Sequence, residues 1–188
     1  MTGEKLASLQ QKIHDSVDNN SAEILGLAAY MHANPELGFQ EFKACAALCD
    51  AMEKHGFEVE RGSCDIPTAF IAKYNSGKPG PRIGVLAEYD ALPGMSQDTV
   101  AFKKAVVEGG NGHGCGHNLL GAGSVAGAVA ISKWLSEGHA GTVKLYGCPA
   151  EEGGGGKAYM SREGCFDGVD IVLDWHPDIC NLVNTESG

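Results

Sequence analysis

Cysteine, histidine and acidic side chains that can bind a metal gather at four places in this sequence. The first is a glycine-rich segment that holds Cys115 and His117, two residues apart. At that spacing the pair cannot share one helical face, but a glycine-flanked loop can turn both toward one point. A helix is expected to begin just after them, and a helix N-terminus lowers the pKa of a thiol and favours the metal-binding thiolate. The alternative is a glycine-rich turn whose His and Cys are incidental.

Two adjacent carboxylates, Glu151 and Glu152, follow a predicted buried strand. One carboxylate can bind a cation while its neighbour takes a proton from the water that the cation activates. The glycines at 153–156 let backbone or substrate approach closely. A phosphate-binding loop is excluded, because the required glycine spacing and the hydroxyl residue after Lys157 are absent from the sequence. A solvated acidic turn is the alternative.

Two further strand ends carry polar side chains. His176 follows the last predicted strand, although a lone histidine is more often structural than a ligand. Glu88 and Asp90 end an earlier strand at alternate positions, which share a face and can point at one site. The alternative for these two acids is a turn with ordinary helix-capping carboxylates. Together the four places supply a thiolate, two imidazoles, a carboxylate ligand and a spare carboxylate as base, the set that a metallohydrolase site needs.

The segments around these residues alternate between helices and strands. Apolar residues recur at helical spacing over 4–32, and further helices are expected at 39–55, 118–137 and 157–163. Strands are expected at 57–61, 69–74, 82–87, 142–148 and 169–174. This order predicts an α/β fold, a three-layer α/β/α sandwich with a largely parallel sheet. Ligands bind such sheets at the carboxyl ends of the strands, where all four groups of residues fall.

Composition and charge limit the classes of partner. The chain has 188 residues, enough for one domain with a sizeable core, and its net charge of −10 without a basic cluster argues against nucleic acid and anionic membranes. Residues 1–20 lack the apolar run of a signal peptide, and glycines and Lys133 interrupt the longest apolar stretch, 119–135, which makes it a poor membrane span. Seven irregularly spaced cysteines fit a reduced, cytoplasmic protein better than a disulfide scaffold.

The sequence resembles the aminoacylase/carboxypeptidase-like metallo-amidohydrolases (metallopeptidases), the group that contains hippurate hydrolase, auxin-conjugate hydrolases and p-aminobenzoyl-glutamate hydrolase. Five stretches carry the resemblance, in the family's order and over most of the chain: 32–39 (HANPELGF), 88–93 (EYDALP), 113–118 (HGCGHN), 149–155 (PAEEGGG) and 176–177 (HP). The resemblance implies a zinc-hydrolase-like fold. It also implies hydrolysis of an amide bond in an N-acyl amino acid, an aminobenzoyl-glutamate or a dipeptide-like substrate.

The resemblance assigns roles to individual residues. Glu151 matches the general base that activates water, and Asp90 matches the acid that supports the metal site. Glu88 stands where relatives carry Asp or a metal-binding His, and Asn118 stands where many carry Asp. The residues that match the family's metal ligands, for one or two ions of Zn²⁺ or Mn²⁺, are Cys115, His117, Glu152 and His176.

Members of this family are much longer than 188 residues. After the His-Pro motif they continue into a lid and dimerisation domain and then complete the catalytic sheet. The resemblance therefore implies that residues 1–188 form the N-terminal part of the catalytic domain, with an incomplete sheet and little or no turnover alone. An exposed sheet edge favours self-association or a second subunit. Two alternatives are a regulatory piece that acts only with a partner, and a structural zinc protein with a closed four-ligand site.

Overall fold

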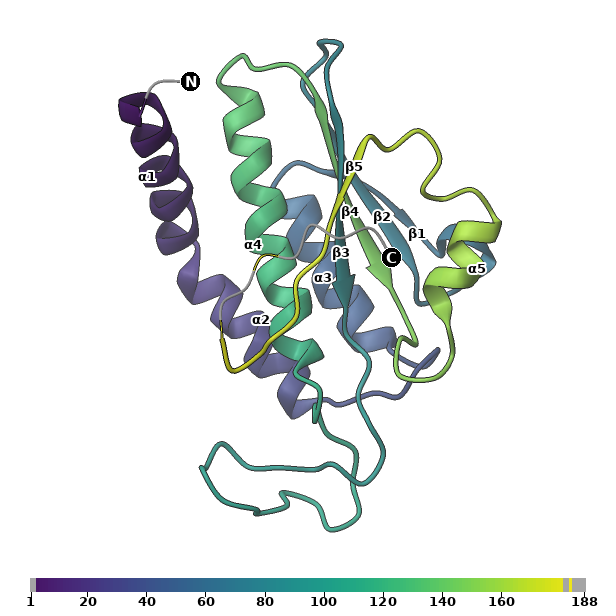
Figure 1. The fold of residues 1–188 in the computed structure, drawn as a ribbon. Helices are drawn as coiled ribbons and strands as arrows, with labels where there is room; N and C mark the ends of the chain where they lie inside the picture. The colour runs from purple at the N-terminus through teal and green to yellow at the C-terminus, as the bar shows by residue number, and fades with distance from the viewer. Residues whose placement is uncertain (1–2, 181–182, 184–188) are drawn as a thin grey trace.

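A five-stranded sheet lies at the centre of the molecule (Figure 1). Its strands are β1 (Glu58–Arg61), β2 (Phe70–Asn75), β3 (Arg82–Glu88), β4 (Thr142–Cys148) and β5 (Ile171–Leu173). The computed structural model, which describes residues 3–180 and 183, orders them β1-β2-β4-β3-β5. β3 pairs in parallel with β4 and β5, whereas β2 runs antiparallel to both β1 and β4. The prediction of a largely parallel sheet is therefore confirmed, with β2 as the strand that runs the other way.

Helices cover both faces of this sheet unequally (Figure 1). One face packs against α3 (Phe42–Lys54) and α4 (His117–Ser136), while α2 (Ser21–Ala33) packs on these two helices and α1 (Gly3–Asn19) packs on α4. The core on that side is built from fully buried side chains such as Met31, Leu48, Val125 and Leu145. The other face carries the short α5 (Gly156–Arg162), whose Met160 packs over Tyr146 and Leu86. Three layers result, as predicted.

The first helical region is divided, where the apolar spacing predicts continuous helix over 4–32. α1 ends at Asn19 and α2 begins at Ser21. The side-chain amide of Asn20 donates to the carbonyl of Ser16 at 2.5 Å, a local bond that competes with continuing the helix. The periodicity of apolar residues passes unbroken across this point, so it cannot reveal the break.

α4 is the core helix that carries His117 into the site. Within the described residues it is the one helix long and apolar enough to cross a membrane, and 61% of its apolar window is buried inside the fold. It packs between α2 on one side and β3 and β4 on the other. Its apolar composition is therefore explained by its place in the core.

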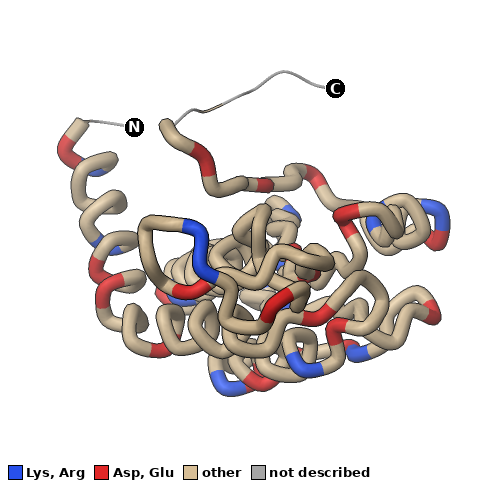
Figure 2. Tube along the Cα trace, turned by 90° about the horizontal axis from the view of Figure 1, so that it is seen from below, with Lys and Arg blue, Asp and Glu red and all other residues tan. Residues whose placement is uncertain are grey.

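The loop that joins β3 to α4, residues 89–116, projects from the end of the sheet where β3 and β4 terminate (Figure 1). Leu92 and Gly112 exchange backbone hydrogen bonds of 2.9 and 3.0 Å, which close the base of the loop and return the chain to the end of β3. Seen from that side, acidic and basic residues are interspersed around the molecule (Figure 2). The backbone bonds between Leu92 and Gly112 thus bring Cys115 back beside the strand ends.

One pair of cysteines departs from the reduced state expected for all seven. Cys64, in the short helix η1 (Ser63–Asp65), forms a disulfide with Cys165, which follows α5. The two residues are 101 positions apart in sequence, a separation at which no local pattern signals pairing. The expectation of reduced thiols is therefore wrong for this pair. The bond ties η1 to the segment that follows the Glu151–Glu152 turn.

Candidate metal centre

Three parallel strands bring the chemically active residues to one end of the sheet. β3 ends at Glu88, β4 leads directly into the Glu151–Glu152 turn, and β5 leads to His176. Gly116 adopts a left-handed backbone with a φ of 85°, so the chain turns sharply between Cys115 and the first residue of α4. As predicted, the four groups of residues meet where parallel strands end.

His117 is the centre of the cluster and is fully buried. Its Nδ1 lies 2.8 Å from Oδ1 of Asp90, a contact that fixes the plane of the ring. Its Nε2 faces three carboxylates: Oε2 of Glu88 at 3.1 Å, Oε2 of Glu151 at 3.8 Å and Oε1 of Glu152 at 3.9 Å. A carboxylate that holds the far nitrogen of an imidazole is the arrangement that orients a metal-binding histidine.

Cys115 and His176 contact each other beside His117. Sγ of Cys115 is 3.2 Å from Nε2 of His176. Nδ1 of His176 lies 2.9 Å from the carbonyl oxygen of Pro177. Because a carbonyl oxygen can only accept a hydrogen bond, Nδ1 carries the proton and Nε2 is the nitrogen left to bind a cation.

Two groups of ligand atoms share His117. In each group one atom per residue lies within 4.8 Å of the others. One group holds Cys115, His117 and His176, and the other holds Glu88, His117 and Glu151. The geometry therefore provides two adjoining positions for cations, one rich in nitrogen and sulfur and one rich in oxygen.

The side chains of the cluster shift the pKa values of Asp90 and His117. Burial alone would raise the pKa of Asp90, but hydrogen bonds from His117 and from the Glu152 amide outweigh it and hold the pKa below its usual range. Burial alone would lower the pKa of His117, but Asp90 and then Glu88 outweigh it and raise that pKa. The side chains by themselves thus favour a charged imidazole among ionised carboxylates.

The thiol of Cys115 behaves differently from the expectation. Burial, and next the carboxylate of Glu152, raise the pKa of Cys115 to about 11. The predicted lowering of this pKa by the start of α4 is therefore wrong for this environment. A thiolate at this position needs a positive charge beside it, and a bound cation supplies one.

The unpaired polar atoms of the cluster fit a divalent cation. Among the described residues, Nε2 of His117 and Oε1 of Glu152 are buried and make no hydrogen bond. Such orphaned atoms are costly in a folded protein unless a ligand completes them. Because they lie 3.9 Å apart and both accept when His117 is neutral, a cation between them would satisfy both.

The structure brings together the seven residues that the sequence singles out, and it adds Lys157. Glu88, which is excluded from the predicted ligand set, lies closer to His117 than either Glu151 or Glu152 does. Its second oxygen contacts Nζ of Lys157, at the start of α5. Lys157 gives no signal in sequence, since a single lysine in a glycine-rich turn is common. Which carboxylate is ligand and which is base stays a prediction.

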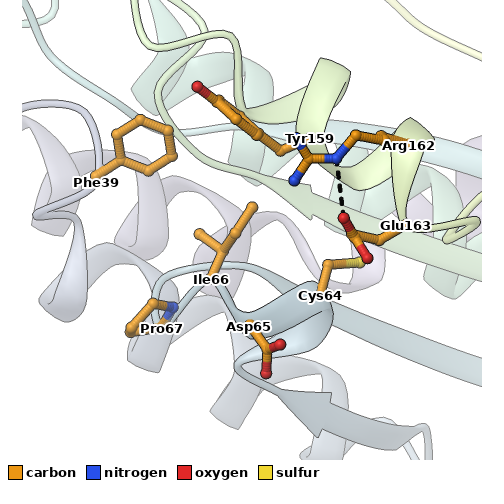
Figure 3. Close-up of a pocket in the computed structure, with 8 residues that line it drawn as sticks. All are labelled: Phe39, Cys64, Asp65, Ile66, Pro67, Tyr159, Arg162 and Glu163. Carbon is orange, nitrogen blue, oxygen red and sulfur yellow. Dashed lines mark hydrogen bonds and ion pairs between the residues drawn. The ribbon is translucent and has the colours of Figure 1, made fainter.

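A pocket of about 470 Å³ opens between η1 and α5, and no residue of the metal cluster is among those that line it (Figure 3). Phe39 and Tyr159 form one wall, with their ring centres 6.3 Å apart and nearly perpendicular. The guanidinium of Arg162 lies 5.3 Å from the ring centre of Tyr159. Phe39 also borders a smaller hollow of about 230 Å³ that Asp90 and Glu152 line, so the aromatic pocket adjoins the candidate metal centre.

The sequence of the chain decides its family. Residues 84–185, more than half of the chain, match the model of peptidase family M20/M25/M40. The chain belongs to this family. All the candidate metal and base residues from Glu88 to His176 lie inside the matched segment.

Individual M20 relatives agree with this assignment. The chain is 46% identical to a subunit of the p-aminobenzoyl-glutamate hydrolase of Escherichia coli (strain K12), over 93% of this chain and 37% of that protein. It is 34% identical to thermostable carboxypeptidase 2 of Saccharolobus solfataricus, over 89% of this chain and 42% of that protein. The chain therefore spans about two fifths of the length of these curated relatives.

A solved structure shows the same fold. The Bacillus subtilis YXEP protein, described as a dinuclear metal-binding peptidase of the M20 family, superposes with a TM-score of 0.73 and 27% identity. The superposition covers 84% of this chain and 43% of that one.

Proposed function

We propose that this chain carries the water-activating part of an M20 amidohydrolase site. The observation that carries the proposal is the convergence on Nε2 of His117, where three carboxylates, a thiol and a second imidazole meet around unpaired buried atoms. A closed structural zinc site needs no spare carboxylate, whereas this cluster holds more acids than one cation requires. The reaction class is hydrolysis of an amide bond.

The residues divide the work as follows. A divalent cation, Zn²⁺ or Mn²⁺, held by Cys115, His117, Glu152 and His176 would lower the pKa of water and polarise the scissile carbonyl. Glu151, whose carboxylate is half-exposed at the edge of the cluster, takes a proton from the attacking water and delivers it to the leaving nitrogen. Asp90 holds Nδ1 of His117 and so fixes the imidazole. A thiolate ligand favours Zn²⁺, and the additional carboxylates also suit Mn²⁺ and a second ion.

Elemental analysis of the purified 188-residue chain tests the proposal. After loading with Zn²⁺ or Mn²⁺ and desalting, we expect bound metal in the unchanged chain and clearly less in Cys115→Ser, because the variant loses a ligand of the nitrogen- and sulfur-rich position. Cys180→Ser is the matched control, since this thiol is free and exposed. Equal metal in all three proteins, or none in any, would contradict a cation site at Cys115.

The substrate that we propose first is an aminobenzoyl-glutamate, and next another N-acyl amino acid or a dipeptide. The aromatic pocket supports this order, because Phe39 and Tyr159 offer ring faces and edges (Figure 3). Phe39 also borders the hollow that Asp90 and Glu152 line. The 46% identity to part of a p-aminobenzoyl-glutamate hydrolase points the same way. We also propose that the 188-residue chain associates with a second copy or a second subunit through the free side of β5, whose Ile171, Val172 and Leu173 are half-exposed.

Phe39 provides a specific test of the aryl pocket. Its φ is 62°, a left-handed backbone that bulky residues rarely adopt, and its ring is 40% exposed, so neither backbone nor core packing requires an aromatic side chain there. In Phe39→Gly we expect the affinity for N-(4-aminobenzoyl)-glutamate, relative to N-acetyl-glutamate, to fall about two- to tenfold. We expect the free energy of unfolding to change by no more than about 1 kcal/mol, because glycine relieves the left-handed strain.

Calorimetric titration of the two ligands and thermal unfolding measure these effects. Phe42→Ala serves as the control, since Phe42 is a similarly exposed ring three residues away in α3. A Phe39 variant that loses stability but keeps its preference for the aryl ligand would show a structural role only.

A further inference from the structure

Two buried carboxylates hold the backbone on both sides of Glu151. The amide of Ala150 donates to Oε1 of Glu41 at 2.7 Å. The amide of Glu152 donates to Oδ2 of Asp90 at 2.9 Å. Glu41 is fully buried and Asp90 is 1% exposed. The Pro149–Ala150 and Glu151–Glu152 peptide groups are therefore both held by hydrogen bonds to buried carboxylates.

The turn that these bonds hold is one that the backbone would not adopt freely. Ala150 has a φ of 54°, the left-handed region that residues with a Cβ rarely occupy. Its methyl group is enclosed by two glycines: a Cβ on Gly38 would lie 2.9 Å from it, and a Cβ on Gly154 would lie 2.5 Å from it. The conformation of the turn therefore depends on contacts from outside it, and Gly38 and Glu41 come from the same segment between α2 and α3.

Glu41 is a carboxylate that the fold buries completely. Among the ion pairs of the described residues none includes Glu41, and its Oε2 is buried without a hydrogen-bond partner. Burial raises the pKa of Glu41, which shows that the ionised side chain is costly at this position, while the Ala150 amide opposes the rise. The contact that Glu41 makes across 109 residues of sequence is with the catalytic turn.

We propose that Glu41 is a positioning residue of the active site, which together with Asp90 clamps the amides on both sides of Glu151. The clamp fixes the left-handed Ala150 and so directs the carboxylates of Glu151 and Glu152 toward His117. Asp90 serves two purposes in this arrangement, because one of its oxygens holds the Glu152 amide and the other holds Nδ1 of His117. The effect on catalysis rests on the proposed function, whereas the clamp itself is a property of the protein without metal.

Amide hydrogen exchange tests the clamp directly. In the metal-free 188-residue chain we expect the Ala150 amide to exchange about tenfold faster, or more, in Glu41→Ala, because a hydrogen bond to a buried carboxylate is lost. Glu41→Gln keeps an acceptor oxygen in the same place and should fall between the unchanged chain and Glu41→Ala. Glu36→Ala is the matched control: Glu36 belongs to the same segment and accepts from the amides of Lys43 and Ala44, away from the turn.

Titration with Co²⁺, followed by its visible absorption, measures the consequence for the site. We expect Glu41→Ala to bind Co²⁺ about ten- to hundredfold more weakly, the loss typical of groups that orient ligands, with recovery in Glu41→Gln. An Ala150 amide that exchanges at the same rate in Glu41→Ala and Glu36→Ala would overturn the proposal. If Glu41→Ala does not fold, unchanged exchange in Glu41→Gln would overturn it equally. Faster exchange in a chain that binds no cation would leave the clamp standing and refute the proposed function instead.

Discussion

Replacing His117 with alanine is expected to remove cation binding from both positions of the site. His117 is the residue that the two groups of ligand atoms share, and its Nε2 lies within 4 Å of three carboxylates. Without it, these acids would repel one another in a buried space. The loss of affinity should exceed about a hundredfold, the upper range for groups that only support a ligand. Elemental analysis and Co²⁺ titration of His117→Ala measure it.

The affinity of the site for a cation should also depend on pH, and the pKa values of its residues give the direction of the change. Before a cation binds, the neighbouring acids raise the pKa of His117, and that of Cys115 is about 11, so protons compete with a cation for both groups. Binding therefore releases protons, and the affinity of the unchanged chain should rise as the pH rises. His139→Ala is the control, because His139 stacks on Trp134 at the far end of α4. Equal metal content in His117→Ala and His139→Ala would exclude His117 from the site.

The strand ends could be predicted from sequence because their signals are local. β4 has the predicted bounds, residues 142–148, since an apolar run lies between Gly141 and Pro149. A strand that ends in acids or histidine places those side chains at the carboxyl edge of a parallel sheet whatever the order of the strands. The gathering of Glu88, Asp90, Glu151 and His176 at this edge therefore follows from short patterns.

The strand order and the residues that support the site could not be predicted in this way. β2 pairs with β4, about 70 residues later in the chain, and the apolar pattern of a strand does not specify its partner. Glu41 meets Ala150 across 109 residues, and Cys64 meets Cys165 across 101. Glu41, Cys64 and Cys165 are single residues outside any strand end, and no local pattern marks them. Only the folded chain shows which distant residue it contacts.

Glu151→Gln should separate catalysis from metal binding. The change keeps the shape of the side chain and removes its ability to take a proton from water. A general base contributes about 10²- to 10⁴-fold to the rate, so we expect kcat to fall by that factor, with bound metal unchanged. The measurement belongs in whichever form of the protein turns over N-(4-aminobenzoyl)-glutamate, the 188-residue chain or a longer one. Metal content is determined on the same samples.

Glu152→Gln is the matched variant, since the two carboxylates are adjacent and lie 3.8 and 3.9 Å from Nε2 of His117. If Glu152 is the ligand and Glu151 the base, Glu152→Gln loses metal and Glu151→Gln does not. If Glu88 and Glu151 instead bind the second cation, as their common group with His117 allows, Glu151→Gln loses metal as well as turnover. A structural zinc site held by Cys115, His117, Glu152 and His176 predicts little change in Glu151→Gln and loss of metal in Glu152→Gln. The changes in metal content and turnover in the two variants thus assign a role to each carboxylate, whereas the nearly equal distances to Nε2 of His117 do not.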